Sequence, residues 1–279
     1  MSLRFSKMHS LGNDFVVLDG VRQSLNIAPS LARHIADRKR GIGCDQILVA
    51  ESDPDDDIDF MFRIYNPDGS ESGQCGNGAR CFAKYLFDNN LTDKSDIVVN
   101  TSSHTRMTLS RNLDDSVTVD MGRPRFEPGE IPFAANQTQP TYSIPLDNTA
   151  LEFSILSMGN PHAVLLVDDV SSAEVDKIGS QVECHPLFPE RTNVGFMQIE
   201  NSKRIKLRVY ERGTGETQAC GSGACAAVVS GRQLGLLEEN VEVNLPGGRL
   251  QVNYAGGART VFLRGDAVHV YDGQIDHTN

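Results

Sequence analysis

The chain has 279 residues, enough for one large domain or two smaller ones, and its 39% hydrophobic and 23% charged residues are typical of a soluble globular protein. A net charge of −11 without a basic stripe argues against a nucleic-acid partner. The first ten residues lack the apolar stretch of a secretory signal, and no apolar run approaches the length of a membrane span. We therefore expect a cytoplasmic protein with no membrane partner.

The six cysteines do not predict a disulfide framework in a chain of this length, and none lies in a C-x-x-C pair. The seven histidines are scattered without ligand spacing, so no metal site is predicted. Four cysteines are expected to be small buried packing residues: Cys44, Cys81, Cys184 and Cys225.

The chain contains an internal repeat, which is most evident in "QCGNGARC" at 74–81 and "QACGSGACA" at 218–226. Further matches keep nearly the same offset, between 143 and 147 residues. They pair Gly12-Asn13 with Gly159-Asn160, "RIYN" with "RVYE", Cys75 with Cys220, "IVVN" with "VEVN", and "VDMG" with "FLRG". So steady an offset indicates a duplicated domain.

Each half opens with a β-branched strand after Gly-Asn, continues with further strands, and then has a Cys-Gly turn, a helix and more strands. After Cys75, apolar residues recur at helical spacing and predict one buried stripe. After Cys220 the run "ACAAVV" is apolar all round, which predicts a helix enclosed by sheet. The expected fold is α/β in the α+β sense, with two pseudo-symmetric domains, each a mostly antiparallel sheet around a central helix.

The expected domains are residues 1–122 plus 266–279, which carry Cys75, and residues 123–265, which carry Cys220. The Pro- and Gly-rich segment 122–133 is expected to connect them. The last segment, "VHVYDGQI", has no counterpart after the first copy, and we expect it to pair with the N-terminal half.

Each repeated turn places a cysteine just before a helix N-terminus, where unpaired N–H groups carry partial positive charge. The thiol pKa is expected to fall, and the glycines let a substrate carboxylate approach the same N–H groups. If the two sulfurs face one substrate from opposite sides, a thiolate can remove a Cα proton while the other thiol returns one. Neither a metal nor an organic cofactor is then needed.

The segments "MHSLGNDFVVLD", "NPDGSE", "QCGNGARC", "MGNPH" and "ERGTGETQACGSGACA" closely resemble, in order, the signatures of the diaminopimelate epimerase family. The resemblance spans nearly the whole chain. It implies a cofactor-independent isomerase that interconverts LL- and meso-diaminopimelate for lysine and cell-wall precursor synthesis. It also implies two related domains, with Cys75 and Cys220 as the catalytic acid–base pair.

The resemblance also implies the residues around the substrate. His162 and Glu211 correspond to residues that tune the ionisation of the two cysteines. The implied substrate-binding residues are Asn13, Gln46, Asn66, Gly76, Asn77, Asn160, Asn193, Glu211, Arg212, Gly221 and Ser222. A homodimer is expected as well, with Tyr271 of the unmatched C-terminal strand at the contact.

Other functions remain open from the sequence. A proline or hydroxyproline racemase of the same architecture would keep both cysteines but take a shorter substrate. A thiol redox protein would exchange a disulfide through the same residues, although the missing C-x-x-C counts against it. A binding module that has lost activity is a third possibility. On the epimerase interpretation, air oxidation is expected to join Cys75 and Cys220 and to abolish activity until a thiol reductant is added.

Overall fold

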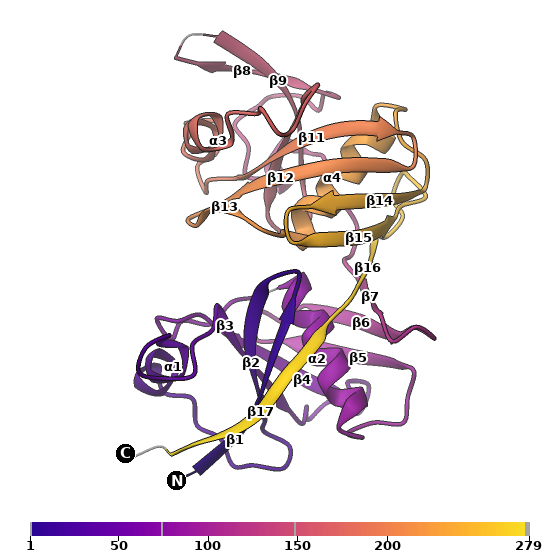
Figure 1. Ribbon diagram of the computed structural model, residues 1–279. Helices are drawn as coiled ribbons and strands as arrows, with labels where there is room; N and C mark the ends of the chain where they lie inside the picture. Colours follow the sequence, from indigo (N-terminus) through magenta and orange to yellow (C-terminus); the bar gives the residue numbers. More distant parts are fainter. Residues whose placement is uncertain (1, 74, 148, 277–279) are drawn as a thin grey trace. The chain divides into compact units, whose positions relative to one another are not determined.

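The computed structural model describes residues 2–73, 75–147 and 149–276. The chain divides into two compact units, the first made of Met1–Val119 with Arg264–Asn279 and the second of Asp120–Leu263. Each unit is a mixed sheet with one long helix against it (Figure 1). The expected fold class, two related α+β units with mostly antiparallel sheets, is confirmed.

The sheet of the first unit places antiparallel and parallel neighbours in a fixed alternation. Strand β1 pairs antiparallel with β2, β2 parallel with β3, β3 antiparallel with β4, β4 parallel with β5, and β5 antiparallel with β6. The strands are β1 (Ser2–Ser10), β2 (Asn13–Asp19), β3 (Gln46–Glu51), β4 (Phe60–Tyr65), β5 (Asp96–Thr101), β6 (Arg106–Arg111) and β7 (Val117–Asp120), which pairs antiparallel with β6.

The second unit repeats this alternation strand for strand. Strand β9 pairs antiparallel with β10, β10 parallel with β11, β11 antiparallel with β12, β12 parallel with β14, and β14 antiparallel with β15. The strands are β8 (Tyr142–Leu146), β9 (Thr149–Ser157), β10 (Pro161–Leu166), β11 (Asn193–Asn201), β12 (Arg204–Glu211), β13 (Gly215–Thr217), β14 (Asn240–Leu245), β15 (Gly248–Asn253) and β16 (Phe262–Gly265). A single 3-10 turn, η1 (Pro128–Glu130), precedes them.

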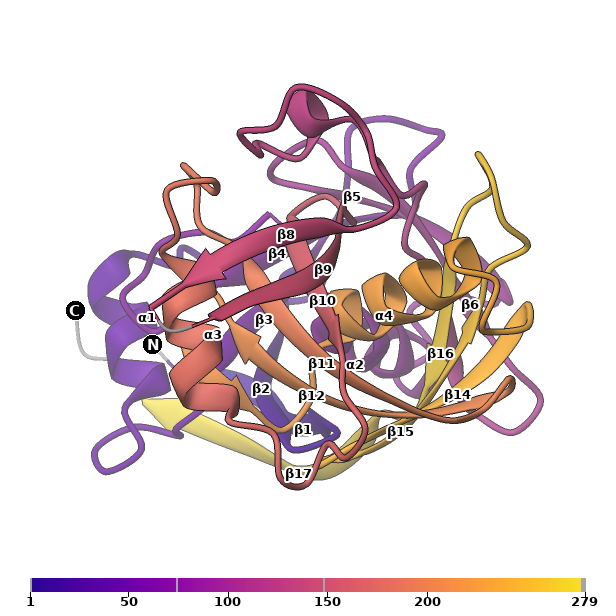
Figure 2. The same ribbon diagram turned by 90° about the horizontal axis from the view of Figure 1, so that it is seen from above.

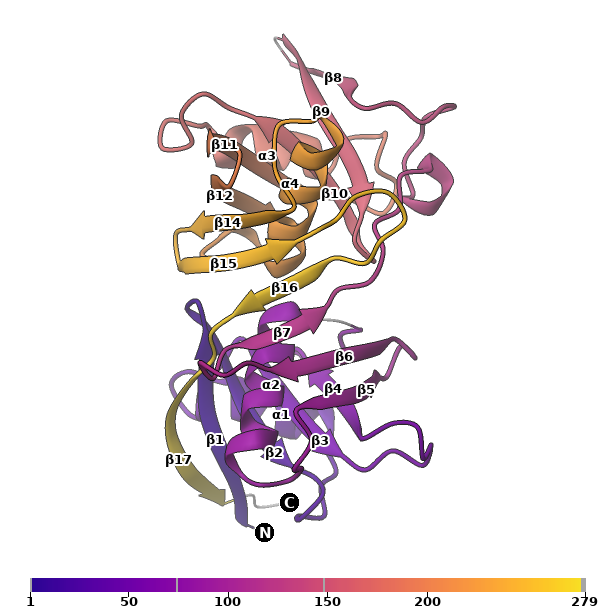
Figure 3. The ribbon, with the colours of Figure 1, turned by 90° about the vertical axis from the view of Figure 1, so that its right-hand side faces the viewer.

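Each unit has a short helix and a longer one that begins immediately after a cysteine. The short helices are α1 (Pro29–Ala36) and α3 (Val175–Glu183), and β8 and β9 lie beside α3 (Figure 2). The longer helices are α2 (Gly76–Asp88) and α4 (Gly221–Gln233), which the views of Figures 1 and 3 place against the sheets of their own units.

Helix α2 is buried far more completely than a single apolar stripe predicts. From Asn77 to Phe87 every residue except Lys84 is buried, including the charged Arg80. The single-stripe prediction is therefore wrong, because the sheet curves around the polar side of the helix as well. Helix α4, which the sequence predicts to be enclosed, is buried from Gly221 to Gly231 except at Ser222.

The C-terminal segment pairs with the first strand of the chain, as expected. It forms β17 (Val268–Asp276), which runs antiparallel to β1 from the Ser2–Asp276 pair to the His9–Val268 pair. Among the described residues, no helix is long and apolar enough to cross a membrane. One packing prediction is wrong: Cys184 is exposed at the end of α3, whereas Cys44, Cys81 and Cys225 are buried.

An arginine–glutamate pair holds the loop that leads to each cysteine. Arg63 on β4 binds Glu71, which also forms a bridge with Tyr65. At the matching place in the second unit, Arg208 on β12 binds Glu216 through two hydrogen bonds of 2.6 and 2.7 Å. A bidentate pair fixes both side chains in one geometry. The two loops are therefore held to their sheets in the same way.

A glycine in α3 gives a direct test of the packing in the second unit. A Cβ atom added at Gly179 would lie 2.5 Å from Cγ and 2.7 Å from Cβ of Tyr210, too close to the backbone of β12 for the ring to move aside. In an exposed helix Gly→Ala stabilises, by about 1 kcal/mol. Here we expect Gly179→Ala to lower the free energy of unfolding by about 1–3 kcal/mol, as overpacking does.

Urea unfolding followed by circular dichroism measures this change. The matched control is Ser180→Ala, because Ser180 is the exposed neighbour of Gly179 on the same helix. An alanine at 179 that leaves the protein equally or more stable would contradict this packing of α3 against Tyr210.

Candidate active site

Both cysteines of the repeated motif occupy the same structural position, the residue just before the first turn of the buried helix. Cys75 caps α2 with φ −149° and ψ 109°, and Cys220 caps α4 with φ −118° and ψ 109°. The backbone N–H of Gly78 lies 3.2 Å from the Cys75 sulfur and donates to it. The first N–H groups of a helix have no partner within it. Each cysteine therefore lies at a positively polarised helix end.

The third helical residue is glycine in both copies, which leaves room for the sulfur to fold back over the turn. A Cβ atom at Gly78 would lie 3.3 Å from the Cys75 sulfur, and one at Gly223 would lie 3.2 Å from the Cys220 sulfur. Both distances are too short for an ordinary carbon–sulfur contact. This explains why both copies of the motif have glycine there. We call the surroundings of Cys75 the first half-site and those of Cys220 the second.

Four amide side chains that the sequence assigns to the site form two hydrogen-bonded pairs in the first unit. The Asn77 side chain donates to Asn13 Oδ1 at 3.3 Å, and Gln46 Nε2 donates to Asn66 Oδ1 at 2.9 Å. Asn13 follows the two-residue turn between β1 and β2, where Leu11 and Gly12 have φ values of 54° and 85°. Positive φ at both positions is typical of a type I′ hairpin turn. That turn places Asn13 beside the first turn of α2.

The second half-site has the same plan with different side chains. Asn160 Nδ2 donates to Ser222 Oγ at 3.4 Å, and Asn160 Oδ1 lies 3.0 Å from His162 Nε2. Asn193 Nδ2 donates to the carbonyl of Pro161 at 3.0 Å, and Asn193 Oδ1 accepts from the main-chain N–H of Arg212 at 3.0 Å. These expected site residues therefore form one connected group in the second unit.

Cys220 differs from the sequence expectation in its ionisation. Burial raises the pKa of the Cys220 thiol well above its ordinary value, and the nearby Glu211 carboxylate raises it further. Interactions with Ser222 and with the Gly223 N–H lower the thiol pKa, but their effect is smaller than that of burial and Glu211. The expectation of a lowered pKa is wrong for this residue, because Cys220 is 5% exposed and lies beside the Glu211 carboxyl group.

The Glu211 carboxyl group lies half-buried beside that thiol. Its pKa is raised because burial disfavours the charged form, while hydrogen bonds with Thr217 and Cys220 act the other way. Thr217 Oγ1 donates to Glu211 Oε1 at 2.5 Å. Glu211 and Cys220 thus form a hydrogen-bonded pair in which each group influences the ionisation of the other.

His162 is fully buried, and this burial lowers its pKa to about 3, with Arg212 as a further cause. The imidazole is therefore neutral at pH 7. Because the Asn160 carbonyl oxygen can only accept, the neutral ring donates its Nε2–H to Asn160. The contact that the structure gives His162 is thus to Asn160, and its influence on the ionisation of a cysteine stays a prediction.

Two other expected residues lie near the surface. The Arg212 guanidinium is exposed and its Nη1 donates to the carbonyl of Glu190 at 3.0 Å. Tyr271 on β17 is 45% exposed, and the edge of its ring packs against Phe5. Gly76 and Gly221 are the first residues of α2 and α4, directly after the cysteines.

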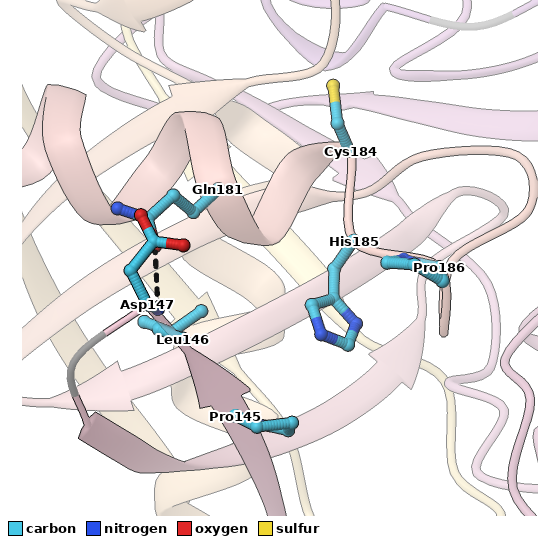
Figure 4. A pocket seen from close by; sticks show the side chains of 7 residues that line it. All are labelled: Pro145, Leu146, Asp147, Gln181, Cys184, His185 and Pro186. Carbon is cyan, nitrogen blue, oxygen red and sulfur yellow. Dashed lines mark hydrogen bonds between the residues drawn. The ribbon is translucent and has the colours of Figure 1, made fainter.

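Other possible sites in the described part of the chain offer little chemistry. Within those residues no group of three or more His, Cys, Asp and Glu side chains has the arrangement of a metal site. A hollow between β8 and the end of α3 is lined by Leu146, Gln181 and His185 among others (Figure 4). The Cys184 sulfur points away from the His185 ring there. The half-sites therefore remain the best candidate for chemistry.

The sequence did not identify three residues that hold these side chains in place. Asp45 Oδ2 accepts from Asn13 Nδ2 at 2.8 Å, Thr217 binds Glu211, and the buried Arg80 binds Asn77. Asp45 is next to Gln46 in the sequence, and Arg80 lies three residues after Asn77. Proximity in sequence to predicted site residues was therefore the only feature of the sequence that could have indicated their role. Charged side chains within motifs are usually solvated, which hides such a role.

The profile of the family described as diaminopimelate epimerase matches residues 5–127 and 154–270. Among solved structures, a hydroxyproline epimerase from Agrobacterium vitis is 14% identical, with a TM-score of 0.71 over 98% of this chain and 92% of that one. A PhzF-family phenazine biosynthesis protein from Bacillus anthracis is 16% identical, with a TM-score of 0.70 over 99% of this chain and 100% of that one.

A probable proline racemase from Agrobacterium radiobacter K84 is 14% identical, with a TM-score of 0.69 over 98% of this chain and 93% of that one. At such identities the structural matches establish a shared fold. The family profile covers most of the chain and includes both cysteine motifs. This chain belongs to the diaminopimelate epimerase family.

Proposed function

We propose that this isomerase is a cofactor-independent epimerase of 2,6-diaminopimelate that exchanges the Cα proton between two cysteines. The observation that carries the proposal is the duplicated half-site, in which Cys75 and Cys220 each cap a buried helix whose first N–H groups can bind a carboxylate. Membership of the family supports an epimerase or isomerase. The reaction would serve lysine and cell-wall precursor synthesis in the cytoplasm.

In the proposed reaction one thiolate takes the Cα proton and the opposite thiol delivers its own proton to the other face. The carbon–hydrogen bond that breaks and the one that forms lie on opposite faces, and no electron leaves the substrate. The helix N-termini stabilise the negative charge that develops on the carboxylate. Because the Cys220 thiol has a raised pKa and bonds to Glu211, Cys220 is assigned as the proton donor of the resting enzyme.

Diaminopimelate is proposed as substrate because the second half-site has more polar side chains than are needed to bind the ammonium and carboxylate groups at one end of an amino acid. One ammonium and one carboxylate suffice for the reacting carbon. Asn193, Glu211 and Arg212 add an amide, a half-buried carboxyl group and a guanidinium within one strand-and-turn region. Such groups suit a second ammonium and carboxylate. Binding them would orient the reacting end and disfavour shorter amino acids.

The test is a proton NMR time course of the reduced protein with meso-diaminopimelate in D₂O, without added cofactor. We expect loss of the Cα proton signal and formation of the LL isomer. Cys75→Ala and Cys220→Ala should each lower turnover by about 10²- to 10⁴-fold, since each removes an acid–base group. Cys184→Ala, at an exposed position outside the half-sites, serves as the control and should retain full turnover.

The other outcomes separate the alternatives. Exchange of proline or hydroxyproline but not of diaminopimelate would remove the substrate assignment and keep the two-thiol chemistry. An inert enzyme whose sulfurs are shown to be reduced would reject the epimerase proposal itself.

His162 is proposed as a neutral donor that orients Asn160, and this has a consequence for stability. An unfolded histidine takes up a proton near pH 6.5, whereas the folded His162 does so only near pH 3. Between these values the unfolded state binds more protons, so the folded state loses stability as pH falls. From pH 7 to pH 5 the loss due to His162 should be about 2 kcal/mol.

His162→Gln removes the titrating group and keeps a donor for Asn160. Urea unfolding at pH 7 and pH 5 should therefore show about 2 kcal/mol less acid destabilisation in this variant than in the wild type. His185→Gln, at a half-buried histidine of the same unit, is the matched control for replacing a histidine by glutamine. Equal acid sensitivity of His162→Gln and the wild type would mean that His162 is protonated in the folded protein.

A homodimer through β17 is proposed from the apolar side chains that this strand exposes. Val268, Val270 and Tyr271 are 43, 51 and 45% exposed, although they lie close together on one strand. A row of exposed apolar residues on a strand is a common site of pairing with a second copy.

Sedimentation velocity tests this contact. We expect Tyr271→Glu to convert a dimer into monomers, because a charge would be buried at the interface. Leu113→Glu, at an exposed residue of the loop between β6 and β7, should leave the dimer intact. A wild-type monomer, or a dimer unaffected by Tyr271→Glu, would exclude this interface.

A further inference from the structure

The proposed chemistry does not use Arg80, although its position is unusual. The side chain lies on α2 and is fully buried, with 0% exposure. Removing a guanidinium from water is costly unless acceptors replace the water. Its Nη2 donates to Asn77 Oδ1 and to Ser10 Oγ, both at 2.7 Å, and its Nη1 donates to the carbonyl of Gly76 at 3.2 Å. Arg80 thus binds the two residues that follow Cys75.

Arg80 is one end of a row of hydrogen bonds that has a single consistent direction. A guanidinium can only donate, so the oxygen of the Asn77 amide must face Arg80. The Asn77 nitrogen is thereby directed at Asn13 Oδ1, 3.3 Å away. The Asn13 nitrogen then donates to Asp45 Oδ2 at 2.8 Å, and Arg38 binds the other oxygen of that carboxylate at 2.7 Å.

Charges at both ends therefore determine the orientation of both amides. If either amide turned over, a nitrogen would face Arg80 or an oxygen would face Asp45. Each such contact would bring together two donors or two acceptors. The chain from Arg80 through Asn77 and Asn13 to Asp45 is called the amide relay below.

The hydrogen bonds that the structure gives for the described residues show no such relay in the second half-site, although its backbone is equivalent. The position that corresponds to Arg80, 145 residues later, is Cys225. Asn160, the counterpart of Asn13, turns its nitrogen toward Ser222 on α4 and its oxygen toward His162. The Asn13 amide instead turns its oxygen toward α2. The duplicated asparagines thus present opposite ends of their amides to the helix that carries the cysteine.

We propose that Arg80 is a positioning residue that fixes the orientation of the Asn13 amide through Asn77 and so makes the two duplicated half-sites chemically different. The proposal rests on the proposed function only in taking the first half-site to bind the substrate. With its oxygen bonded to Asn77 and its nitrogen directed at Asp45, the Asn13 amide presents a donor and no acceptor to the first half-site. Such a donor matches the carboxylate of an amino-acid substrate.

The orientation of Asn13 can be measured without any activity. In protein labelled with ¹⁵N-asparagine, the side-chain resonances of Asn13 and Asn160 are assigned from their loss in Asn13→Asp and Asn160→Asp. We expect Arg80→Met to shift the Asn13 side-chain resonance by more than its line width and to leave that of Asn160 in place. Phe82→Leu, at a fully buried position of the same helix, should shift neither.

Kinetics give a second readout that loss of packing alone would not produce. Arg80→Met should lower kcat/KM by about 10- to 100-fold, the effect of losing a hydrogen bond to a charged group. The same change should cost little in an Asn77→Ala background, because both act through one relay. Arg80→Lys should recover part of the activity, since an ammonium can still donate to Asn77. In the double variant of Phe82→Leu and Asn77→Ala, the two reductions in kcat/KM should multiply, because Phe82 is not part of the amide relay.

The outcomes distinguish this proposal from the proposed function. If the wild type exchanges no amino acid but Arg80→Met moves the Asn13 resonance, the relay stands and the proposed function fails. If a folded Arg80→Met leaves that resonance and the Asn77→Ala effect unchanged, the positioning role is wrong. Should Arg80→Met not fold, Arg80→Gln is judged by the same criteria, because it is polar but uncharged and enforces no direction.

Discussion

A helix enclosed by a sheet must satisfy the N–H groups of its first turn without water. In both units a cysteine, Cys75 or Cys220, occupies the capping position where natural helices usually have Ser, Thr, Asp or Asn. The Cys75 sulfur accepts the Gly78 N–H, whereas among the described residues the Cys220 side chain makes no capping hydrogen bond. A thiol is a weak partner for these N–H groups, so positive potential remains for a ligand. The glycines at positions 78 and 223 let the sulfur lie over the turn. The rest of each half-site is built around that exposed potential.

The two units keep one backbone plan and differ in the side chains that surround the cysteine. The alternation of parallel and antiparallel strands is identical, and the Arg63–Glu71 and Arg208–Glu216 pairs hold equivalent loops. At matched positions of the two copies, however, Phe15 corresponds to His162 and Asn66 to Glu211. The duplication gave both units the same backbone geometry, and substitutions at a few matched positions made the surroundings of the two cysteines different.

Burial has opposite consequences for the groups of the second unit, because the charged form is always the one disfavoured. It raises the pKa of the Cys220 thiol and the Glu211 carboxyl group, and it lowers that of His162. All three groups therefore tend toward their neutral forms. A neutral thiol carries a proton that it can donate. Cys220 is therefore suited to act as the proton donor when a bound substrate changes its protonation equilibrium. The first unit has a buried cation, Arg80, close to its helix turn instead.

The sequence by itself determined the duplication, the two Cys-Gly turns, the helices after them, the α+β class and the family. These features are local or periodic, so spacing and composition express them directly: a constant offset relates the copies, and glycine after cysteine marks each turn. Only the tertiary structure decided the ionisation of Cys220, the neutrality of His162 and the complete burial of α2 with Arg80 inside it. It also decided which way the Asn13 and Asn160 amides point. The physical reason is that pKa values and amide orientations depend on neighbours from other strands, which approach only when the sheet closes around the helix.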